Sequence, residues 1–514
     1  MNPLSRSLRY AALLHFSAVS IFADTSLTIY NQNFGVVRDT VPLDLQQGEN
    51  RLRFTDTTAH AEPDSVILRD PSGKTKLTIL EQNYRADPIS EARLLSLHEG
   101  KEIEFFVREQ NKPDRIVKGK IIRSGYVPHN AQAMQRYGQI YYQNQMAMAY
   151  GGGGANQPII EVDGQLQFSL PGLPRFPALA DDTILKPTLD WRLHSDQAGK
   201  LDAELSYVTG GMSWDASYNV ISPEKSDELD LTGWVTMDNQ SGKEFRDAKI
   251  QLVAGDVAKI VDPRMDGNMH VANKSMLGAM KANAPMPPQV TEKSFDEYHL
   301  YTLPLATTLH DRETKQVEFV RASEVKSKRI YVYDGLYIDP NQWRGQSLTY
   351  LRTREDFGNE SNTKVWVMRE FKNSEQNKLG MALPRGRVRF YRRDDDNGRL
   401  QFVGEDLIDH TPKDEFIRVN TGNAFDLVGE RRRTDFKVDS SNHWLDETFE
   451  IKVRNHKKEP VEIRVVEHLF RWVNWEIRQP SIPFTKKDAQ TIEYRVPLKP
   501  DEEKTLTYTV HYTW

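Results

Sequence analysis

Methionine is concentrated in one Pro- and Asn-rich stretch of this sequence, and its thioether sulfur is a ligand for soft metals. At about four-residue spacing and beside a histidine, such sulfurs can capture Cu(I). Methionine is also a flexible, unbranched side chain that suits a linker lying loosely on apolar surface, and no His/Met cluster is completed nearby. The linker interpretation is favoured, so no metal ligand is assigned. The residues are Met265, Met269, Met276, Met280, Met286 and His270.

Two short fragments have the residue types of ligand-binding loops but the wrong spacing. Ser72–Thr75 ends like a phosphate-binding loop, yet Leu68 stands where such a loop needs its first glycine. A turn between two strands is favoured instead. Asp394–Gly398 offers carboxylates that suit Ca²⁺, but its glycine is fifth rather than sixth, unlike an EF-hand. A hairpin tip is favoured there, with a surface Ca²⁺ site as the alternative.

Tryptophan is the other candidate for ligand contact, because its flat ring can stack on a sugar or a peptide. Trp472 and Trp475 are three residues apart, so a strand through both would place them on opposite faces, one in the core and one exposed. For each of them a core position is the favoured alternative to a ligand role. Trp343, Trp366 and Trp444 lie elsewhere in the C-terminal half.

The sequence contains none of the common catalytic signatures. It has no Cys, which excludes thiol nucleophiles, Cys-ligated zinc and disulfides. It has neither the Gly-x-Ser-x-Gly nucleophile elbow nor the His-Glu-x-x-His zinc motif. We therefore assign no catalytic residue, no cofactor-binding residue and no metal site.

The charge balance argues against a nucleic-acid partner. The 514 residues include 68 Lys and Arg against 73 Asp and Glu, and binding to phosphates requires a dense basic surface. The clearest basic run, Arg431-Arg432-Arg433, sits between Glu430 and Asp435. We interpret it as a solvated loop or edge strand of mixed charge.

The N-terminus has the three parts of a secretory signal peptide. Arg6 and Arg9 precede an apolar run, residues 11–22, which ends at a small Ala23. The run is short for a membrane span, and without Cys a lipoprotein anchor is impossible. We expect residues 1–23 to be removed, leaving no stable transmembrane segment, and the protein to reach the periplasm or the extracellular space. A buried N-terminal helix is the alternative.

Hydrophobic alternation with a period of two predicts half-buried strands in most of the chain, as in residues 505–512. Asp163-Gly164 and Asn397-Gly398 mark tight hairpin turns between such segments. Helical spacing is scarce, and residues 89–97 form the best candidate. The fold class is therefore all-β, with several antiparallel β-sandwich (immunoglobulin-like) or small-barrel modules in tandem and little helix.

Two segments interrupt the strand pattern and divide the chain. Residues 129–158 are rich in Gln, Asn, Tyr, Met and Gly, and residues 262–297 are rich in Met, Ala, Asn and Pro, as in mobile insertions or linkers. A repeated strand end, at Asn239, Asn373 and Asn455, suggests duplicated modules, with coincidence as the alternative. The expected regions are a leader at 1–23, a β module at 24–86, a small β module at 87–185, a sandwich at 186–362 and a C-terminal sandwich at 363–514.

Several sequence blocks, in order along the mature chain, resemble the bacterial exported proteins grouped as domain of unknown function 4139, a family distantly related to mucoidy inhibitor A-like proteins. The helical insertion of the latter is not evident here. The resemblance implies an exported, β-rich protein and transfers no catalytic residue or cofactor. The blocks are 27–34, 81–84, 205–214, 231–235, 253–257, 429–432, 455–457 and 466–468.

Two functions from different classes fit these observations. The favoured one is a non-enzymatic binding or scaffolding protein of the cell envelope, which contacts a protein or glycan through sandwich loops and sheet edges or through the two interrupting segments. The alternative is an envelope hydrolase of glycan or peptide, whose carboxylates converge only in the fold. A cleft with two carboxylates of displaced pKa would favour the hydrolase.

Overall fold

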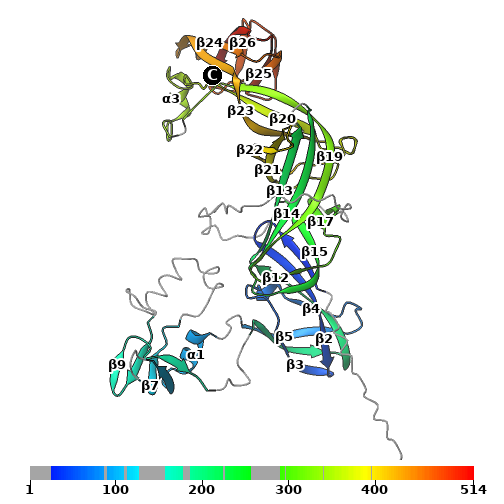
Figure 1. The fold of residues 1–514 in the computed structure, drawn as a ribbon, viewed down its shortest axis with the longest axis vertical. Helices are drawn as coiled ribbons and strands as arrows, with labels where there is room; N and C mark the ends of the chain where they lie inside the picture. Colours follow the sequence, from blue (N-terminus) through cyan, green and yellow to red (C-terminus); the bar gives the residue numbers. More distant parts are fainter. Residues whose placement is uncertain are drawn as a thin grey trace, which may run out of the picture.

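The computed structural model describes residues 25–85, 90–108, 113–126, 157–177, 186–223, 226–255, 257, 290–295, 297–339, 341–394 and 396–514. It is an elongated molecule built almost entirely of strands (Figure 1). The prediction of an all-β fold with several mainly antiparallel sheets is confirmed. None of the helices in these ranges is long and apolar enough to cross a membrane.

Several predicted features fall outside these ranges. They include the leader at 1–23, most of the insertions at 129–158 and 262–297, and the methionines and His270 of the copper hypothesis. The predicted domain boundaries stay predictions.

Long strands, which we call lead strands, organise the main body. β19 (Glu313–Asp334) and β23 (Phe416–Asp439) are continuous. β12 (Gly199–Gly210) and β13 (Met212–Pro223) form a third lead strand, broken at Gly211. Gly211 has φ +78°, and a Cβ there would lie 2.8 Å from the carbonyl oxygen of Gln240, so the break requires glycine. The short β1 (Ser26–Tyr30) takes the same role at the N-terminal end.

Each lead strand begins a unit of the fold. It pairs antiparallel with the strand that follows it, and that strand pairs antiparallel with the first half of the next lead strand or, in the last unit, with β29. The four successive runs are β1–β2–β12, β13–β14–β19, β19–β20–β23 and β23–β24–β29. The additional strands are β2 (Phe34–Leu45), β14 (Glu228–Asn239), β20 (Lys364–Lys372), β24 (Trp444–Asn455) and β29 (Glu503–Thr513).

A further strand, which we call the cover strand, connects neighbouring units. It pairs in parallel with the lead strand of the unit before its own. The three cover strands of this kind are β15 (Phe245–Ala254) on β1, β21 (Gly386–Arg393) on β13 and β25 (Val461–His468) on β19.

The repeated asparagine of the sequence marks the turn that leads into each cover strand. Asn239, Asn373 and Asn455 are fully buried, and each amide nitrogen donates to two or three main-chain carbonyls. One of these carbonyls always lies a few residues before the next lead strand or β29. The sequence echo thus corresponds to a repeated structural corner. The carbonyls belong to His310, Pro412 and Lys499.

Shorter strands complete the sheets. β3 (Gly48–Phe54), β11 (Thr188–Ser195) and β5 (Leu77–Arg85) form a separate three-stranded sheet in that order, and β4 (Ile67–Arg69) pairs with β12. β17 (Tyr298–Thr302) and β18 (Thr307–Leu309) pair with β15, and β16 (Thr291–Phe295) pairs with β17. β22 (Leu400–Ile408) pairs with β21. Single-turn 3-10 helices occur at Pro63–Ser65 (η1) and Glu375–Asn377 (η3).

A small module is inserted between β5 and β11. Helix α1 (Glu91–Leu97) confirms the helix expected at 89–97, with Ile89 outside the described residues, and the Ser90 hydroxyl caps it by accepting from the Arg93 N–H. The Asp163-Gly164 hairpin is confirmed, with positive φ at both residues. The sheet has the order β10–β6–β7–β8–β9, formed by Leu173–Arg175, Glu102–Val107, Arg115–Arg123, Ile159–Val162 and Gln165–Gln167.

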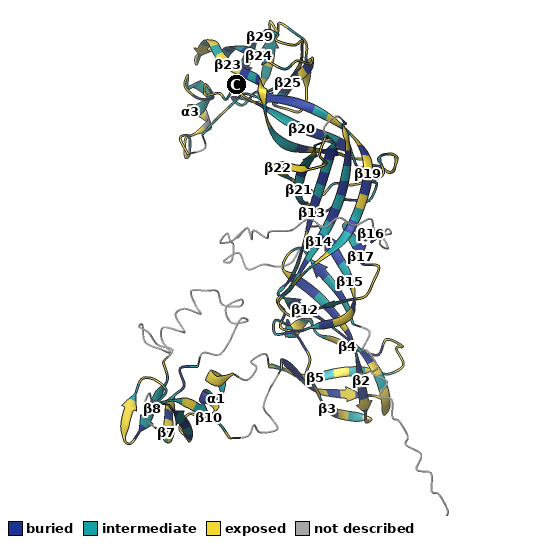
Figure 2. Ribbon diagram, viewed as in Figure 1, coloured by how far each residue is buried: buried dark blue, intermediate teal, exposed yellow. Residues whose placement is uncertain are grey.

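The C-terminal sandwich has its own hydrophobic core. One sheet consists of the second half of β23 with β24, β29 and β26 (Trp475–Arg478); the other consists of the end of β19 with β25, β28 (Thr491–Leu498) and β27 (Phe484–Lys486). Buried positions alternate with less buried ones along β24 and β29, and Figure 2 shows such changes of burial most clearly along the long strand β19. The alternation expected at 505–512 is confirmed, because Leu506, Tyr508, Val510 and Tyr512 are all buried.

Candidate functional site

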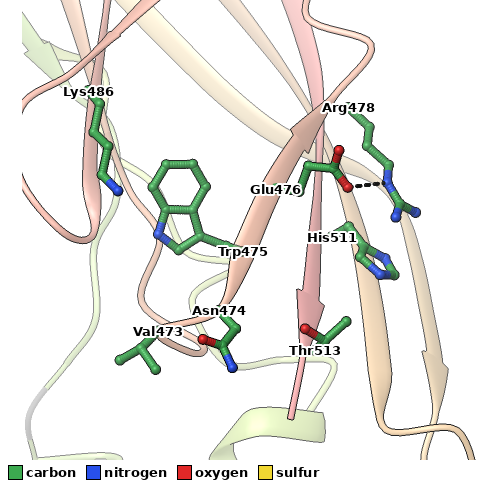
Figure 3. A pocket seen from close by; sticks show the side chains of 8 residues that line it. All are labelled: Val473, Asn474, Trp475, Glu476, Arg478, Lys486, His511 and Thr513. Carbon is green, nitrogen blue, oxygen red and sulfur yellow. Dashed lines mark hydrogen bonds and ion pairs between the residues drawn. The ribbon is translucent and has the colours of Figure 1, made fainter.

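A polar hollow of about 490 Å³ opens at one side of the C-terminal sandwich, and we call it the edge hollow (Figure 3). It lies where β26 and β27 form the outer strands of the two sheets. Alternation along β26 directs Trp475 and Ile477 against the core and leaves Glu476 and Arg478 exposed. The hollow is lined by Val473, Asn474, Trp475, Glu476, Arg478, Lys486, His511 and Thr513.

Trp475 is held in a fixed orientation at this hollow. Its indole N–H donates to the carbonyl oxygen of Ala489 at 2.8 Å, and the Lys486 ammonium lies 4.7 Å from the ring centroid. An aromatic face next to a cation attracts it electrostatically, so Lys486 and the indole support each other's position. The result is a fixed apolar surface beside a positive charge.

The prediction that one strand carries Trp472 and Trp475 on opposite faces is wrong. Trp472 precedes β26, and both rings are partly buried against the C-terminal core. The Arg352 guanidinium lies 3.6 Å from the centre of the Trp472 ring. Trp472 therefore has a structural role, and Trp475 alone reaches the hollow.

Polar side chains of the hollow and of the neighbouring strand β24 form a row across three strands. The register places His511 between Asp446 of β24 and Glu476 of β26. Nδ1 of His511 lies 2.6 Å from Oδ1 of Asp446, and Nε of Arg478 donates to Glu476 at 3.1 Å. Asp446 interacts with His511, and Glu476 interacts with Arg478. The row therefore presents hydrogen-bonding side chains that a polar partner can contact. Sequence reasoning missed this row, although the polar positions of β29 include His511.

The main chain of β26 is also available for binding. It pairs with β29 from Trp475 opposite Tyr512 to Arg478 opposite Thr509, and no other described strand pairs with it. Its opposite edge therefore presents unpaired N–H and C=O groups. The strand is short and charged, which protects such an edge from indiscriminate pairing.

The basic run 431–433 is not solvated as a whole, which corrects the sequence interpretation. It lies in β23, where alternation directs Arg431 and Arg433 inward and Arg432 outward, to pair with Glu450. Only Arg432 has the expected exposed position, whereas the Arg431 side chain is 1% exposed. The alternation of inward and outward side chains along a strand therefore holds for charged residues as well as for apolar ones.

Arg431 forms a buried ion pair with Glu467 of β25. Nε of Arg431 lies 3.0 Å from Oε2 of Glu467, which also accepts from the Tyr508 hydroxyl. Burial alone would lower the pKa of Arg431, but the adjacent Glu467 carboxylate raises it above its usual value, so the group stays charged. The guanidinium also covers the Phe449 ring and donates to the Gly358 carbonyl oxygen.

A second buried carboxylate, Glu447 of β24, accepts from Arg433 at 3.1 Å and from Arg471 at 2.8 Å. Arg471 also donates to three carbonyls at the C-terminal end of helix α3 (Leu348–Thr353) and to that of Phe357. The last carbonyls of a helix form its negative end, which a cation complements. The network thus fixes the α3 segment on the sandwich.

Neither buried carboxylate can serve the hydrolase alternative. The Glu447 and Glu467 side chains are 1% and 0% exposed, so a substrate cannot reach them. Among the described residues, no group of three or more His, Asp or Glu side chains is placed to hold a metal ion.

We expect a pH-dependent contribution to stability from His468, which joins the end of β25 to Asp334 at the end of β19. Nε2 of His468 lies 2.9 Å from Oδ2 of Asp334, and this hydrogen bond raises the pKa of His468 above 6.5. Glu467 and Asp488 act in the same direction. The stabilisation is complete below pH 6.5 and is lost as the pH rises through the higher folded-state value.

Urea unfolding across this pH range measures the effect. Because the pair is partly exposed, its size is about 0.2–1 kcal/mol. Asp334→Asn should flatten the difference, whereas the exposed His456→Gln should leave it intact. A profile of the same shape in Asp334→Asn would show that the pair contributes nothing.

The two ligand-like loop fragments have structural roles. Asp70 accepts from the main-chain N–H groups of Ser72, Lys74 and Thr75, which a phosphate would have to use. The Ser72 hydroxyl and these N–H groups lower the pKa of Asp70 to about 2. The turn is therefore confirmed. The hairpin tip at 394–398 is also confirmed, because it joins β21 to β22.

The chain is thus an all-β protein of several mainly antiparallel sheets, with a polar hollow at one sheet edge. The chain belongs to the DUF4139 family, described as domain of unknown function, whose model matches residues 203–514. The match begins within β12 and extends to the end of β29. No curated protein and no solved structure matches the chain.

Proposed function

We propose that this chain is an exported protein of the bacterial cell envelope that binds a partner and does not catalyse a reaction. The leader-like residues 1–23 support export, and their place before a Cys-free, β-rich chain fits the periplasm or the extracellular space. The observation that carries the binding role is the edge hollow beside β26, whose far edge pairs with no described strand.

The partner segment that fits best is an extended polypeptide. The free edge of β26 offers main-chain donors and acceptors to an added strand, which supplies affinity without regard to sequence. Trp475 offers apolar surface, and Glu476, Arg478 and Lys486 offer charges of both signs, which together select side chains. The hollow opens at the sheet edge, where an added strand can reach it.

Photo-crosslinking in cells tests this function. A benzophenone amino acid in place of Glu476 should capture one or a few exported proteins, identified by mass spectrometry. Trp475→Ala should reduce capture, since loss of a central tryptophan costs about 2 kcal/mol or more of binding free energy. Arg478→Glu should reduce it without touching the core. Lys200→Glu, an exposed change on β12, is the matched control.

Two results would contradict the proposal. Capture that is equal in all variants would show that the hollow does not select the partner. Adducts that carry glycan and no polypeptide would assign the hollow to sugar binding instead.

A further inference from the structure

The repeat leaves one strand edge vacant at the C-terminal end of the array. The lead strands β1, β13 and β19 are each covered on one edge by a parallel strand, while the following strand of their own unit lies on the other edge. The second half of β23 pairs with β24 in the same way. On its other edge, residues 430–439 have no strand partner in the described part of the chain.

This vacant edge is accessible. Thr434, Asp435, Lys437 and Val438 are exposed. The α3 segment contacts the inward side chain of Arg431 through Gly358, on the core side of the strand. A β-bulge between Arg433 and Asp435 and the charged side chains keep the edge from pairing at random.

The N-terminal end of the array has the complementary vacancy. β3 follows β2 as β15 follows β14, β21 follows β20 and β25 follows β24, which makes β3 the cover strand of the first unit. Each later cover strand pairs with the preceding lead strand and with at least one further strand. Within the described residues, β3 pairs with β11 alone and no lead strand precedes its unit.

The sequence of β3 supports this equivalence. β3 contains Arg-Leu-Arg-Phe at 51–54, and the cover strand β21 contains Arg-Val-Arg-Phe at 387–390. In both strands the apolar residues face a core and the arginines face outward. β3 therefore has the same alternation as β21, the strand that pairs with the edge of β13 within the chain.

We propose that two copies of this chain associate head to tail, with β3 of one copy added in parallel to residues 430–439 of β23 in the other. Figure 1 shows β3 and the C-terminal sandwich at opposite ends of the long axis, so one copy cannot fill its own vacancy. The contact repeats the cover-strand pairing that already connects units inside the chain. Because the two surfaces differ, association continues from copy to copy and forms an open chain.

Single cysteines test this contact cleanly, because the natural sequence has none. Two populations of the full mature chain are prepared, one with Arg51→Cys on β3 and the other with Lys437→Cys on β23, each with a different tag. Under mild oxidation the mixture should give the mixed disulfide at least about tenfold above the matched control Glu81→Cys, which lies on β5 at the opposite edge of the same sheet. Neither population alone should give that yield.

The orientation provides an independent measurement. In a parallel pair, moving the β3 cysteine from residue 49 to residue 53 should move the preferred β23 position toward its C-terminus. Sedimentation velocity of the unmodified chain should show a mass that increases with concentration.

Each alternative result overturns the proposal. Equal disulfide yields with β5 and β3 cysteines would make the contact non-specific, and the reverse positional order would make it antiparallel. A constant monomer mass without mixed disulfide would exclude self-association. Capture of another protein by the residue 437 cysteine in cells, without a second copy, would assign the edge to a different partner. None of these results bears on the edge hollow at β26.

Discussion

Glu467→Ala should lower the free energy of unfolding of the C-terminal sandwich by about 3–5 kcal/mol, the cost of leaving a buried charge without its partner. The substitution leaves the Arg431 guanidinium and the Tyr508 hydroxyl without their shared acceptor, in a place where neither reaches water. Urea unfolding measures the change as a shift of the midpoint at constant slope.

The ion pair of Arg432, which follows Arg431 on β23, provides a matched control for this prediction. Arg432 pairs with Glu450 at 3.0 Å, but the Arg432 side chain is 64% exposed. Arg432→Ala should therefore cost about 0–1 kcal/mol, because solvent screens the pair. Equal losses in the two variants would contradict the assignment of Arg431 and Glu467 as a buried pair.

A double variant separates the burial of charge from the loss of packing. Arg431→Met with Glu467→Leu removes both charges and keeps the volume apolar, so most of the stability lost in Glu467→Ala should return. A double variant as unstable as the single one would mean that the hydrogen bonds to Gly358 and Tyr508, rather than charge pairing, fix the site.

Local alternation was enough to predict the strands, the hairpins and the all-β class. The signal was strongest at 505–512, where apolar and polar residues alternate and the apolar ones are buried. The hairpin signals were local as well, because Asp163, Gly164 and Gly398 have positive φ, which these residue types tolerate. Neither the alternation nor these turns depends on which elements pack against the two faces of a strand.

The buried ion pairs could not be predicted from local alternation alone, because their partners lie far apart in sequence. Glu467 and Arg431 are 36 residues apart in sequence. The identity of a charged residue does not show whether its face of the strand is exposed to solvent or buried. One signal was present: Glu447 occupies an inward position between Leu445 and Phe449. A charge inside an otherwise apolar face indicates a buried partner.

The edge hollow depends on which strands end a sheet, and this is a property of topology. β26 resembles other short strands in sequence, and only the order β24–β29–β26 shows that its far edge is free. The same applies to β3 and the second half of β23. The repeated asparagine was the one long-range feature visible in the sequence, because it recurs at the same step of each unit.

Asn455→Ala should destabilise the protein by about 3 kcal/mol, because it leaves several buried main-chain groups unpaired at once. Nδ2 of Asn455 donates to the carbonyls of Glu459 and Lys499, and Oδ1 accepts from the Lys457 N–H, all at 2.9 Å. Asn442→Ala, at an exposed asparagine, is the control, and urea unfolding measures both. Similar losses here would contradict the buried role.

Asn455→Asp tests the same corner with almost no change of volume. It keeps an acceptor for the Lys457 N–H but places a carboxylate oxygen against two carbonyl oxygens, so we expect a loss at least as large as that of Asn455→Ala. Because Asn239 and Asn373 donate to carbonyls in the same way, their aspartate variants should lose stability by a similar amount. If only one of the three sites responds, the corner is not a repeated element, and the equivalence of the units, on which the assignment of β3 as a cover strand depends, is lost.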